Sequence, residues 1–415
     1  MPGEVPKTGS AKGPLAGVRI IDMTTVIMGP YCTQILADYG ADVIKVEPPA
    51  GDIMRHGGFM RNPGMGAVFL QINRNKRSIV LDVKQEAGRA ALLRMCEQAD
   101  IFVHNVRPAA MRRSRLGEDD VRGVNPRLIY VSLVGYGQDG PDAAAPAYDD
   151  LIQGRTGFPA LSAQTAGSDP RYVPVTLCDQ IVGLNGVHAV LAALVHRDRT
   201  GVGQAVELAM LETMAQFVLV DHMGGRTFEP PLGAPGYARM LAPDRRPYQT
   251  ADGYICMLLY TDNHWRSFFT AIGKAEEFAK DPRLGTPAAR ARHFAESYAM
   301  VAGIMRGRST AEWIALLDAN DIPFGPVNDL DALIDDPHLT AVNFIQDVPH
   351  PTEGPLRLSG IPSRWSDTQP EITRHPPNLG EHSEDVFREF GFAENEIEGL
   401  VSSGVTRTFR VREKA

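Results

Sequence analysis

Short apolar runs rich in β-branched residues alternate with amphipathic stretches along the first half of the chain. An apolar run at 18–23 is followed by Gly29-Pro30, then by a helical pattern, and then by a second β-branched run at 42–46. Proline suits the first turn of a helix, where the backbone N–H has no intrahelical partner. A strand, a helix and a strand at this spacing predict a right-handed crossover between parallel strands.

The same alternation continues to residue 208 and favours an α/β fold with a doubly wound parallel sheet. Further strands are predicted at 78–83, 101–103, 128–134 and 204–208, and helices at 86–98 and 181–196. Gly, Pro and Arg crowd 224–247, which predicts a linker or a mobile loop. Beyond it we expect a strand at 254–260, helices at 265–272 and 310–320, an irregular stretch at 349–377 and helix over 383–404.

The 415 residues exceed what one hydrophobic core usually supports, so we expect two domains. The predicted parts are a leader (1–13), a large domain (14–222), a linker or mobile loop (223–247), a smaller domain (248–343) and a C-terminal return to the large domain (344–415).

Composition narrows the function classes. The net charge of −8 argues against a nucleic-acid or membrane surface, and we find no run of about 20 apolar residues that predicts a membrane span. The N-terminus lacks the apolar core of a signal peptide. Four cysteines, at 32, 96, 178 and 256, match neither a disulfide framework nor a zinc pattern. No histidine spacing is typical of a metal site. We therefore expect a cytoplasmic protein without a catalytic metal.

Two local motifs resemble known binding or catalytic motifs but lack the surrounding structure that those functions need. Residues 135–140 read G-x-G-x-x-G after a predicted strand, but prolines at 141 and 146 make a poor helix start. Dinucleotide binding needs a helix there, so nicotinamide or flavin binding is disfavoured, while a glycine loop for another ligand stays open. His196-Arg197-Asp198 is interpreted as a helix end rather than as part of a kinase catalytic loop.

Two polar features each allow two interpretations. The basic cluster at 73–78 is either a solvated turn or a rim that faces phosphates. Asp179 precedes an apolar helix, where it is either an N-cap or a carboxylate beside a close ligand approach near Gly183 and Gly186.

An ordered set of short motifs between about residues 14 and 405 resembles the CaiB/BaiF (class III) coenzyme A transferase family. The motifs lie at 14–19, 28–30, 40–48, 75–78, 125–130, 135–138, 200–204 and 379–383. The resemblance implies a Rossmann-like large domain built from both chain ends, a smaller inserted α/β domain and an interlocked homodimer.

The resemblance also implies the chemistry and the site. Asp179 is then the nucleophile, which forms a mixed anhydride with the acyl group and afterwards a thioester with CoA. Acyl-CoA and a small carboxylic acid are the implied partners, with CoA as a substrate and no tightly bound cofactor. The implied CoA contacts are Leu81 and Val83 beside the adenine, Lys84 as a basic neighbour, Asn105 holding CoA, Arg113 near its phosphates and Tyr136 near the acyl group.

This sequence departs from two branches of the family. Thr25 and Ile27 stand where the formyl-CoA:oxalate branch has histidine and glutamine, and Tyr148 stands where the racemase branch has its histidine. CoA transfer is the first hypothesis. Racemase-type α-proton chemistry and a non-catalytic acyl-CoA-binding protein are the alternatives. Small dicarboxylates are expected substrates, with the segment 224–236 as candidate lid. Arg55, Arg61 and Arg155 are either carboxylate ligands or solvated residues.

Overall fold

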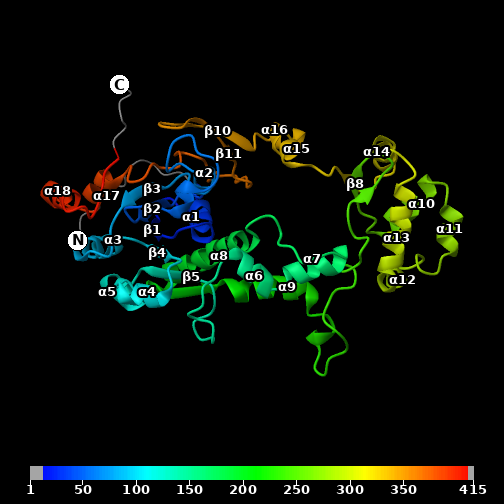
Figure 1. The fold of residues 1–415 in the computed structure, drawn as a ribbon, viewed down its shortest axis with the longest axis horizontal. Coiled ribbons are helices and arrows are strands. Elements are labelled where there is room, and N and C mark those ends of the chain that lie inside the picture. The colour runs from blue at the N-terminus through cyan, green and yellow to red at the C-terminus, as the bar shows by residue number, and fades with distance from the viewer. Residues whose placement is uncertain (1–12, 410–415) are drawn as a thin grey trace. The chain divides into compact units, whose positions relative to one another are not determined.

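A six-stranded parallel sheet forms the centre of the first part of the chain (Figure 1). The computed structural model describes residues 13–409, so the predicted leader lies outside the described residues except for Gly13. The strand order is β3-β2-β1-β4-β5-β6, the order of a doubly wound Rossmann sheet. The chain winds outward from β1 on one side and from β4 on the other. The predicted Rossmann-like α/β fold is therefore confirmed, with its topological switch point between β1 and β4.

Contacts divide the chain into two compact units, and the first draws on both chain ends. It comprises the residues up to Thr156, Val173–Gln216 and the residues from Pro337 onward. Its elements are β1 (Arg19–Met23), α1 (Met28–Asp38), β2 (Asp42–Glu47), η1 (Ile53–His56), α2 (Ala67–Ile72), β3 (Arg77–Val80), α3 (Glu86–Cys96), β4 (Ile101–His104), α4 (Pro108–Arg113), α5 (Glu118–Val124), β5 (Ile129–Val134), α6 (Asp149–Arg155), α8 (Leu177–Thr200), β6 (Ala205–Ala209), the start of α9 (Met210–His222), α16 (Pro337–Ala341), β10 (Ile345–His350), β11 (Gly354–Ser359), α17 (Ser383–Glu389) and α18 (Glu394–Ser402).

The second unit comprises Gly157–Tyr172 and Phe217–Asp336, so it takes in part of the range expected for the large domain. Its elements are α7 (Phe158–Ala166), η2 (Gly224–Thr227), β7 (Tyr248–Gln249), β8 (Tyr254–Met257), α10 (Asp262–Ala271), α11 (Ala275–Lys280), α12 (Pro287–Arg292), α13 (Phe294–Met305), α14 (Thr310–Ala319), β9 (Phe324–Gly325) and α15 (Leu330–Ile334). The buried core of this unit centres on aromatic residues such as Trp265, Phe268 and Trp313.

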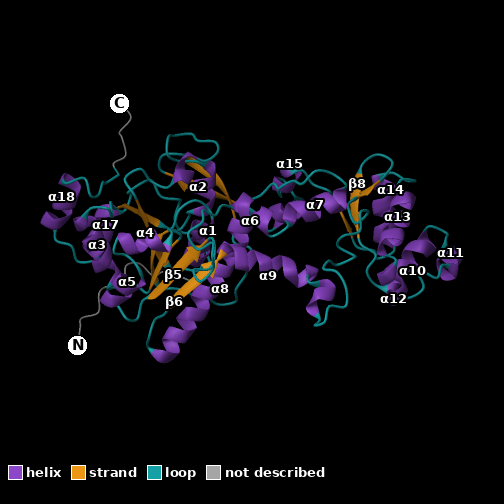
Figure 2. Ribbon diagram, turned by 60° about the horizontal axis from the view of Figure 1, so that its bottom comes forward, coloured by secondary structure: helices purple, strands orange, loops and turns teal. Residues whose placement is uncertain are grey.

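Helices cover both faces of the large sheet (Figure 2). Ile20 and Ile21 are both fully buried, and successive side chains of a strand point to opposite faces. Ile21 belongs to a core that includes side chains of α3, α5, α17 and α18. Helices α1 and α8 pack together on the other face, where Gly186 of α8 lies near Cys32 of α1 and Leu133 of β5.

Two glycines let α8 approach α1 closely. A Cβ atom on Gly183 would lie 2.7 Å from the Met28 carbonyl oxygen, and one on Gly186 would lie 3.0 Å from Cys32 Sγ. One interpretation of the sequence placed a close ligand approach near these glycines. In the structure both glycines serve the packing of α8 against α1. Because the contacts advance in the same direction along both helices, α1 and α8 run parallel and begin at the carboxyl edge of the sheet.

Helix α8 is long and apolar enough to cross a membrane by length and composition, contrary to the expectation that the chain holds no such stretch. Of its most apolar 18-residue window, 44% is buried inside the chain, against α1 and the sheet. Buried core helices are apolar for the same reason, so the pattern here reflects packing.

The basic cluster at 73–78 is buried, so both interpretations of it were wrong. Lys76 and Arg74 are 0% and 3% exposed. The Lys76 ammonium lies 3.1 Å from Asp22 Oδ2, and Arg74 binds both carboxylate oxygens of Asp38, at 2.7 and 3.0 Å. Burial lowers the pKa of Lys76 to about 8. Buried charges need partners, and these acids supply them.

Two further expectations are corrected near the C-terminus. The region 349–377 does not begin irregular, because β10 and β11 form an antiparallel hairpin in which Pro349 lies opposite Pro355. A two-stranded ribbon has free edges, where proline loses no ladder bond. The helix expected over 383–404 is two helices, separated at Gly391, whose φ of 78° favours glycine.

Candidate active site

Asp179 lies in the first turn of α8 and does not cap it, so the N-cap interpretation was wrong. Thr176 occupies the N-cap position, but its side chain makes no capping hydrogen bond to the backbone. The N–H groups of Cys178 and Asp179 instead donate to Asp149 Oδ1, at 2.7 and 3.1 Å. Within residues 13–409 the carboxylate of Asp179 has no hydrogen bond or ion pair. It is half-buried and free to react.

Asp149 is itself held in place by a buried glutamine. Gln153, one turn later on α6 and fully buried, donates from Nε2 to Asp149 Oδ2 at 2.6 Å. Its Oε1 accepts from the Val173 N–H at 2.9 Å. Sequence reasoning did not assign a role to either residue. The i, i+4 spacing of Asp149 and Gln153 on a helix is the signal that would have suggested the pair.

The environment of Asp179 changes its titration. Burial, and secondly the negative charge of Asp149, raise the pKa of Asp179 to about 7. Both effects disfavour the charged form. A carboxylate with a strongly raised pKa that has lost solvation without gaining a counter-ion is typical of a reactive group rather than of a structural one.

Asn105 and Thr25 meet at the topological switch point, one directly after β4 and the other shortly after β1. Asn105 Oδ1 accepts from the Thr25 N–H at 2.9 Å, and Asn105 Nδ2 donates to the Thr25 carbonyl at 2.7 Å. The resemblance assigns Asn105 to CoA. In this structure both polar ends of its amide are occupied by the Thr25 backbone, so its side chain fixes a loop at the carboxyl edge, where ligands of such sheets bind.

Tyr136 follows β5 and is buried, with the Arg155 guanidinium carbon 5.0 Å from its ring centre. Beside it, Gly135 packs so closely that a Cβ atom would lie 2.1 Å from the Ala147 Cβ. Ala147 is two residues from Asp149. The segment 147–149 therefore joins the loop after β5 to the start of α8, which brings Tyr136 and Asp179 to the same edge of the sheet.

The glycine loop at 135–140 does not open a helix, since α6 begins only at Asp149. The N–H groups of Gly137 and Gln138 donate to carboxylate oxygens of Glu212 and Glu207, each at 2.9 Å. Acidic side chains thus occupy donors that a pyrophosphate would need. This agrees with the expectation against a dinucleotide site.

The remaining CoA candidates differ in accessibility. Leu81 is 1% exposed and belongs to the core, and Val83 is half-buried against that core. Lys84 is exposed in the turn between β3 and α3. Arg113, the last residue of α4, is exposed. The side chain of Leu81 is therefore packed in the protein, whereas Lys84 and Arg113 face solvent.

Arg113 is one of four exposed arginines that follow β4, and sequence reasoning singled out only this one. The four are Arg107, Arg112, Arg113 and Arg115. None of the four guanidinium groups has an ion-pair partner within the described part of the chain. Such a concentration of unpaired arginines is typical of a surface that binds phosphate groups.

The three arginines considered for a second carboxylate are all engaged. Arg55 is 1% exposed and binds Glu47 at 2.6 and 2.7 Å, so it is neither solvated nor free. Arg61 donates to the Glu353 carbonyl, and Arg155 pairs with Asp142 at 2.7 Å.

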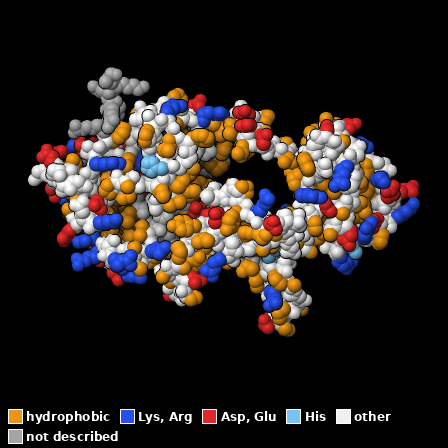
Figure 3. All heavy atoms as spheres, viewed as in Figure 1, with side chains coloured by type: hydrophobic (Ala, Val, Ile, Leu, Met, Phe, Trp, Pro, Cys, Tyr) orange, Lys and Arg blue, Asp and Glu red, His pale blue; other side chains and the backbone are white. Residues whose placement is uncertain are grey.

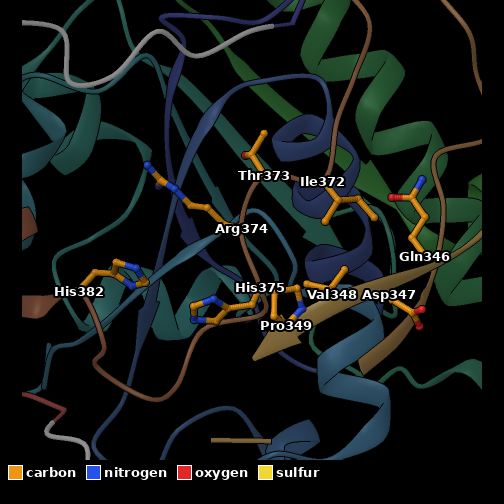
Figure 4. Close-up of a pocket in the computed structure, with 9 residues that line it drawn as sticks. All are labelled: Gln346, Asp347, Val348, Pro349, Ile372, Thr373, Arg374, His375 and His382. Atoms are coloured by element: carbon orange, nitrogen blue, oxygen red, sulfur yellow. The ribbon is translucent and has the colours of Figure 1, made fainter. Parts of the chain in front are cut away.

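Neither of two cavities in the first unit includes Asp179. One of about 430 Å³ is lined by residues of β10, by 372–375 and by His382 (Figure 4). The other, of about 1100 Å³, lies among residues 50–65, 350–354 and 407–409. No group of three or more His, Cys, Asp or Glu side chains arranged to hold a metal occurs among residues 13–409.

A doubly wound sheet with an unpaired carboxylate, a fixed loop at the switch point and unpaired arginines after β4 is typical of α/β proteins that bind phosphate-bearing ligands. The chain belongs to CoA-transferase family III, the CaiB/BaiF family, whose family model matches residues 15–383.

Relatives and solved structures agree. The chain is 32% identical over 394 residues to the succinate--glutarate CoA-transferase of Agrobacterium fabrum, covering 91% of this chain and 96% of the relative. It is 33% identical over 416 residues to the formyl-CoA:oxalate CoA-transferase of Streptomyces coelicolor, covering 94% and 98%. The crystal structure of a CaiB/BaiF family protein from Brucella suis matches with 30% identity and a TM-score of 0.76, covering 91% of this chain and all (100%) of that one. The protein is therefore a CoA-transferase.

Proposed function

We propose that the protein moves CoA from an acyl-CoA donor to a small carboxylic acid, with Asp179 as the nucleophile. The observation that carries the proposal is the carboxylate of Asp179, which has no hydrogen-bond partner among the described residues and a pKa raised to about 7 by burial and by Asp149. A desolvated carboxylate is a stronger nucleophile than a solvated one. Covalent catalysis also divides a difficult exchange into easier steps.

The proposed reaction has four steps. A carboxylate oxygen of Asp179 attacks the donor thioester carbon, the C–S bond breaks, and a mixed anhydride and CoA thiolate result. The thiolate attacks the Asp179 carbonyl carbon, releases the donor acid as a carboxylate and leaves an aspartyl-CoA thioester. The acceptor carboxylate displaces the thiolate to form a second anhydride. The thiolate then attacks the acceptor acyl carbon, which frees Asp179 without net proton transfer.

The chain's own residues would bind and orient the donor. Lys84 and the arginines at 107, 112, 113 and 115 supply positive charge for the CoA phosphates, which favours charge-assisted hydrogen bonds. Tyr136 lies at the same edge as Asp179, where the resemblance places it near the acyl group. Reactive anhydrides must be kept from water. The segment 224–236 stays our candidate for the lid.

Small dicarboxylates are the acceptor class that we propose. Two relatives of nearly equal identity are named for succinate and glutarate and for formyl-CoA and oxalate. Overall similarity does not separate these branches, whereas Thr25 and Ile27 argue against oxalate. Because Arg55 is bound to Glu47, it is removed from the candidates for the second carboxylate.

We also propose a homodimer in the cytoplasm. Large apolar side chains are exposed along α9 and after it, and Figure 3 shows hydrophobic side chains on this surface. They include Phe217, Val220, Phe228 and Leu232, of which Val220 is 80% exposed. Exposed large apolar side chains of this kind are common at interaction sites, and a second copy of the chain is the occupant that the family implies.

The test is a chromatographic screen. Succinyl-CoA and acetyl-CoA are each mixed with a panel of mono- and dicarboxylates, and new CoA thioesters are scored against an Asp179→Ala control. The proposal expects a new thioester that the control does not make, and a mass adduct on the peptide that contains Asp179. Equal turnover by Asp179→Ala would refute it. Solvent deuterium at the α-carbon without new thioesters would support racemase-type chemistry, against which Tyr148 argues because it stands where the racemase branch has its histidine.

A further inference from the structure

The loop between β1 and α1 contains a residue in an unfavourable backbone conformation. Val26 has φ 71°, in the left-handed region. A β-branched residue in this region is a genuine outlier, because its side chain crowds the backbone. Such conformations persist only where the surroundings enforce them, and they concentrate at functional sites. The loop lies at the switch point of the sheet, so the groups that enforce its shape bear on the site.

Asp52 makes two hydrogen bonds to this loop and is the side chain that binds the N–H of the strained Val26. Its Oδ1 accepts from the Thr25 hydroxyl at 2.9 Å and from the Val26 N–H at 3.2 Å. The same oxygen accepts from the Met54 N–H at 3.0 Å, which fixes Asp52 as the N-cap of η1. Asp52 is 2% exposed, so water does not compete for these bonds.

Lys45 holds Asp52 against the loop from the other side. Its ammonium lies 2.9 Å from Asp52 Oδ2 and donates to the Thr24 carbonyl, also at 2.9 Å. Burial alone would raise the pKa of Asp52, but the charge of Lys45 and the hydrogen bonds to the carboxylate lower it overall. The carboxylate therefore stays ionised at neutral pH and keeps all of its acceptor positions.

Asn105 also fixes the loop, since its side-chain amide binds both the N–H and the carbonyl of Thr25. The Thr24 N–H donates to Asp22 Oδ1 at 2.9 Å. The polar backbone atoms from the Thr24 N–H to the Val26 N–H are thus all bound to side chains from other elements. These hydrogen bonds restrict the loop on both sides of Thr25, which is what a strained residue such as Val26 requires.

The geometry of this loop is transmitted to Asp179. Helix α1 begins at Met28, two residues after Val26, and a Cβ atom on Gly183 would lie 2.7 Å from the Met28 carbonyl. Gly183 is one turn beyond Asp179 on α8. Relaxation of Val26 to a common φ would move Met28 and with it the contact that seats the first turns of α8.

We propose that Asp52 is a positioning residue for CoA transfer: it holds Thr25 and Val26 in their strained conformation and thereby places the start of α1 against the part of α8 that carries Asp179. The proposal rests on the proposed role of Asp179. It adds a residue that touches neither acyl group nor CoA in the proposed reaction and acts through the loop alone.

The experiment compares Asp52→Asn with a matched variant, Asp38→Asn, in the full chain. Asp38 is equally buried (3% exposed) and paired with Arg74, but it lies at the other end of α1. Both variants lose a buried charge and should lower the Tm. Asp52→Asn should lower kcat about 10- to 100-fold with less than about a threefold change in KM for acyl-CoA, whereas Asp38→Asn should change kcat less than about twofold.

A second substitution tests the strain directly. Glycine adopts φ 71° at no steric cost, so Val26→Gly in the Asp52→Asn background should recover at least about threefold of the lost kcat. A kcat of Asp52→Asn equal to that of Asp38→Asn, or no recovery in the double variant, would overturn the proposal.

The proposal can also be tested if Asp52→Asn does not fold. In that case Thr25→Val, which loses the hydroxyl hydrogen bond to Asp52, is compared with Thr25→Ser, which keeps it. A kcat at least about threefold lower for Thr25→Val supports the proposal, and equal values overturn it.

Turnover by Asp179→Ala would refute the proposed function itself. An inactive Asp179→Ala together with a fully active Asp52→Asn would refute the positioning role alone.

Discussion

The carboxylate of Asp149 accepts a hydrogen bond from the backbone N–H of Asp179, at 3.1 Å. Asp149 thus accepts from the N–H groups of Cys178 and Asp179 in the first turn of α8. The Asp179 carboxylate, in the same turn, has no hydrogen-bond partner among the described residues. Both carboxylates lie at the positive, N-terminal end of the α8 dipole. Burial nevertheless shifts the protonation equilibrium of Asp179 toward the neutral form.

The rate of acyl transfer should depend on pH near neutrality. Since the pKa of Asp179 is raised to about 7 and only the carboxylate attacks, kcat/KM for the donor should rise with pH and level off above about pH 8. Asp149→Asn removes the second cause of the shift and should move the profile to lower pH. A profile of kcat/KM from about pH 5 to 9 checks both, and an identical midpoint in the variant would contradict the role of Asp149.

The same raised pKa should make Asp179 costly for stability at high pH. Its pKa is about 7 in the folded chain, against about 3.8 for an ordinary aspartate in the unfolded chain, so the folded protein loses stability as pH rises from about 4 to 7. Asp179→Asn should therefore raise the free energy of unfolding by about 1–3 kcal/mol at pH 8. The difference should vanish near pH 4.

Urea unfolding of both proteins across this pH range measures the effect. Asp139→Asn, at an exposed position, serves as the control and should show no such trend. A constant difference between Asp179→Asn and the parent protein at all pH values would show that the gain does not come from ionisation.

The arginines after β4 should bind the CoA phosphates. Arg113→Gln and Arg112→Gln should each weaken CoA binding about three- to tenfold and reduce its dependence on salt. Titration calorimetry with CoA at about 50 and about 300 mM salt measures both quantities. Arg292→Gln, an exposed arginine of α12, is the matched control. Equal affinities in all three variants would place the phosphates elsewhere.

Gly183→Ala should destabilise the first unit, because the new methyl group would meet the Met28 carbonyl at 2.7 Å. We expect a loss of about 1–3 kcal/mol, since neither backbone can move freely. Gly123→Ala in α5 is the control, because no atom lies within 4 Å of its added Cβ. It should be neutral or stabilise by about 0.5 kcal/mol. Chemical denaturation decides, and similar values for the two variants would show that α1 and α8 can separate.

Local patterns predicted most of the sheet. Strand β2 was expected at 42–46 and occupies Asp42–Glu47, because the β-branched residues Val43, Ile44 and Val46 mark the strand after the glycine that ends α1. Helix α1 was likewise marked by Gly29-Pro30 at its start and Gly40 at its end, and α3 was expected within 86–98. The hairpin of β10 and β11 was missed because its prolines argued against strands, although its free edges tolerate them.

The predictions that were wrong concern features that depend on contacts between residues far apart in the sequence. The cluster at 73–78 was taken as exposed because its partners are remote: Asp22 lies 54 residues before Lys76, and Asp38 lies 36 before Arg74. The first turn of α8 was missed for the same reason, since the residue that caps it is Asp149, 30 positions before Asp179. Asp179 itself was found through the family motifs, and its free carboxylate emerges only from the fold.

The C-terminal residues bear on the order in which this chain can fold during synthesis. Helix α17 and the segment after α18 complete the edge of the sheet at β3: Arg77 pairs with Glu389, and the Thr406 hydroxyl donates to the Val80 carbonyl. A strand made among the first 80 residues thus waits for residues made about 300 positions later. During synthesis β3 therefore stays partly uncovered until residues up to Thr406 have been made, and in that interval Ile79 and Val80 are open to non-native contacts.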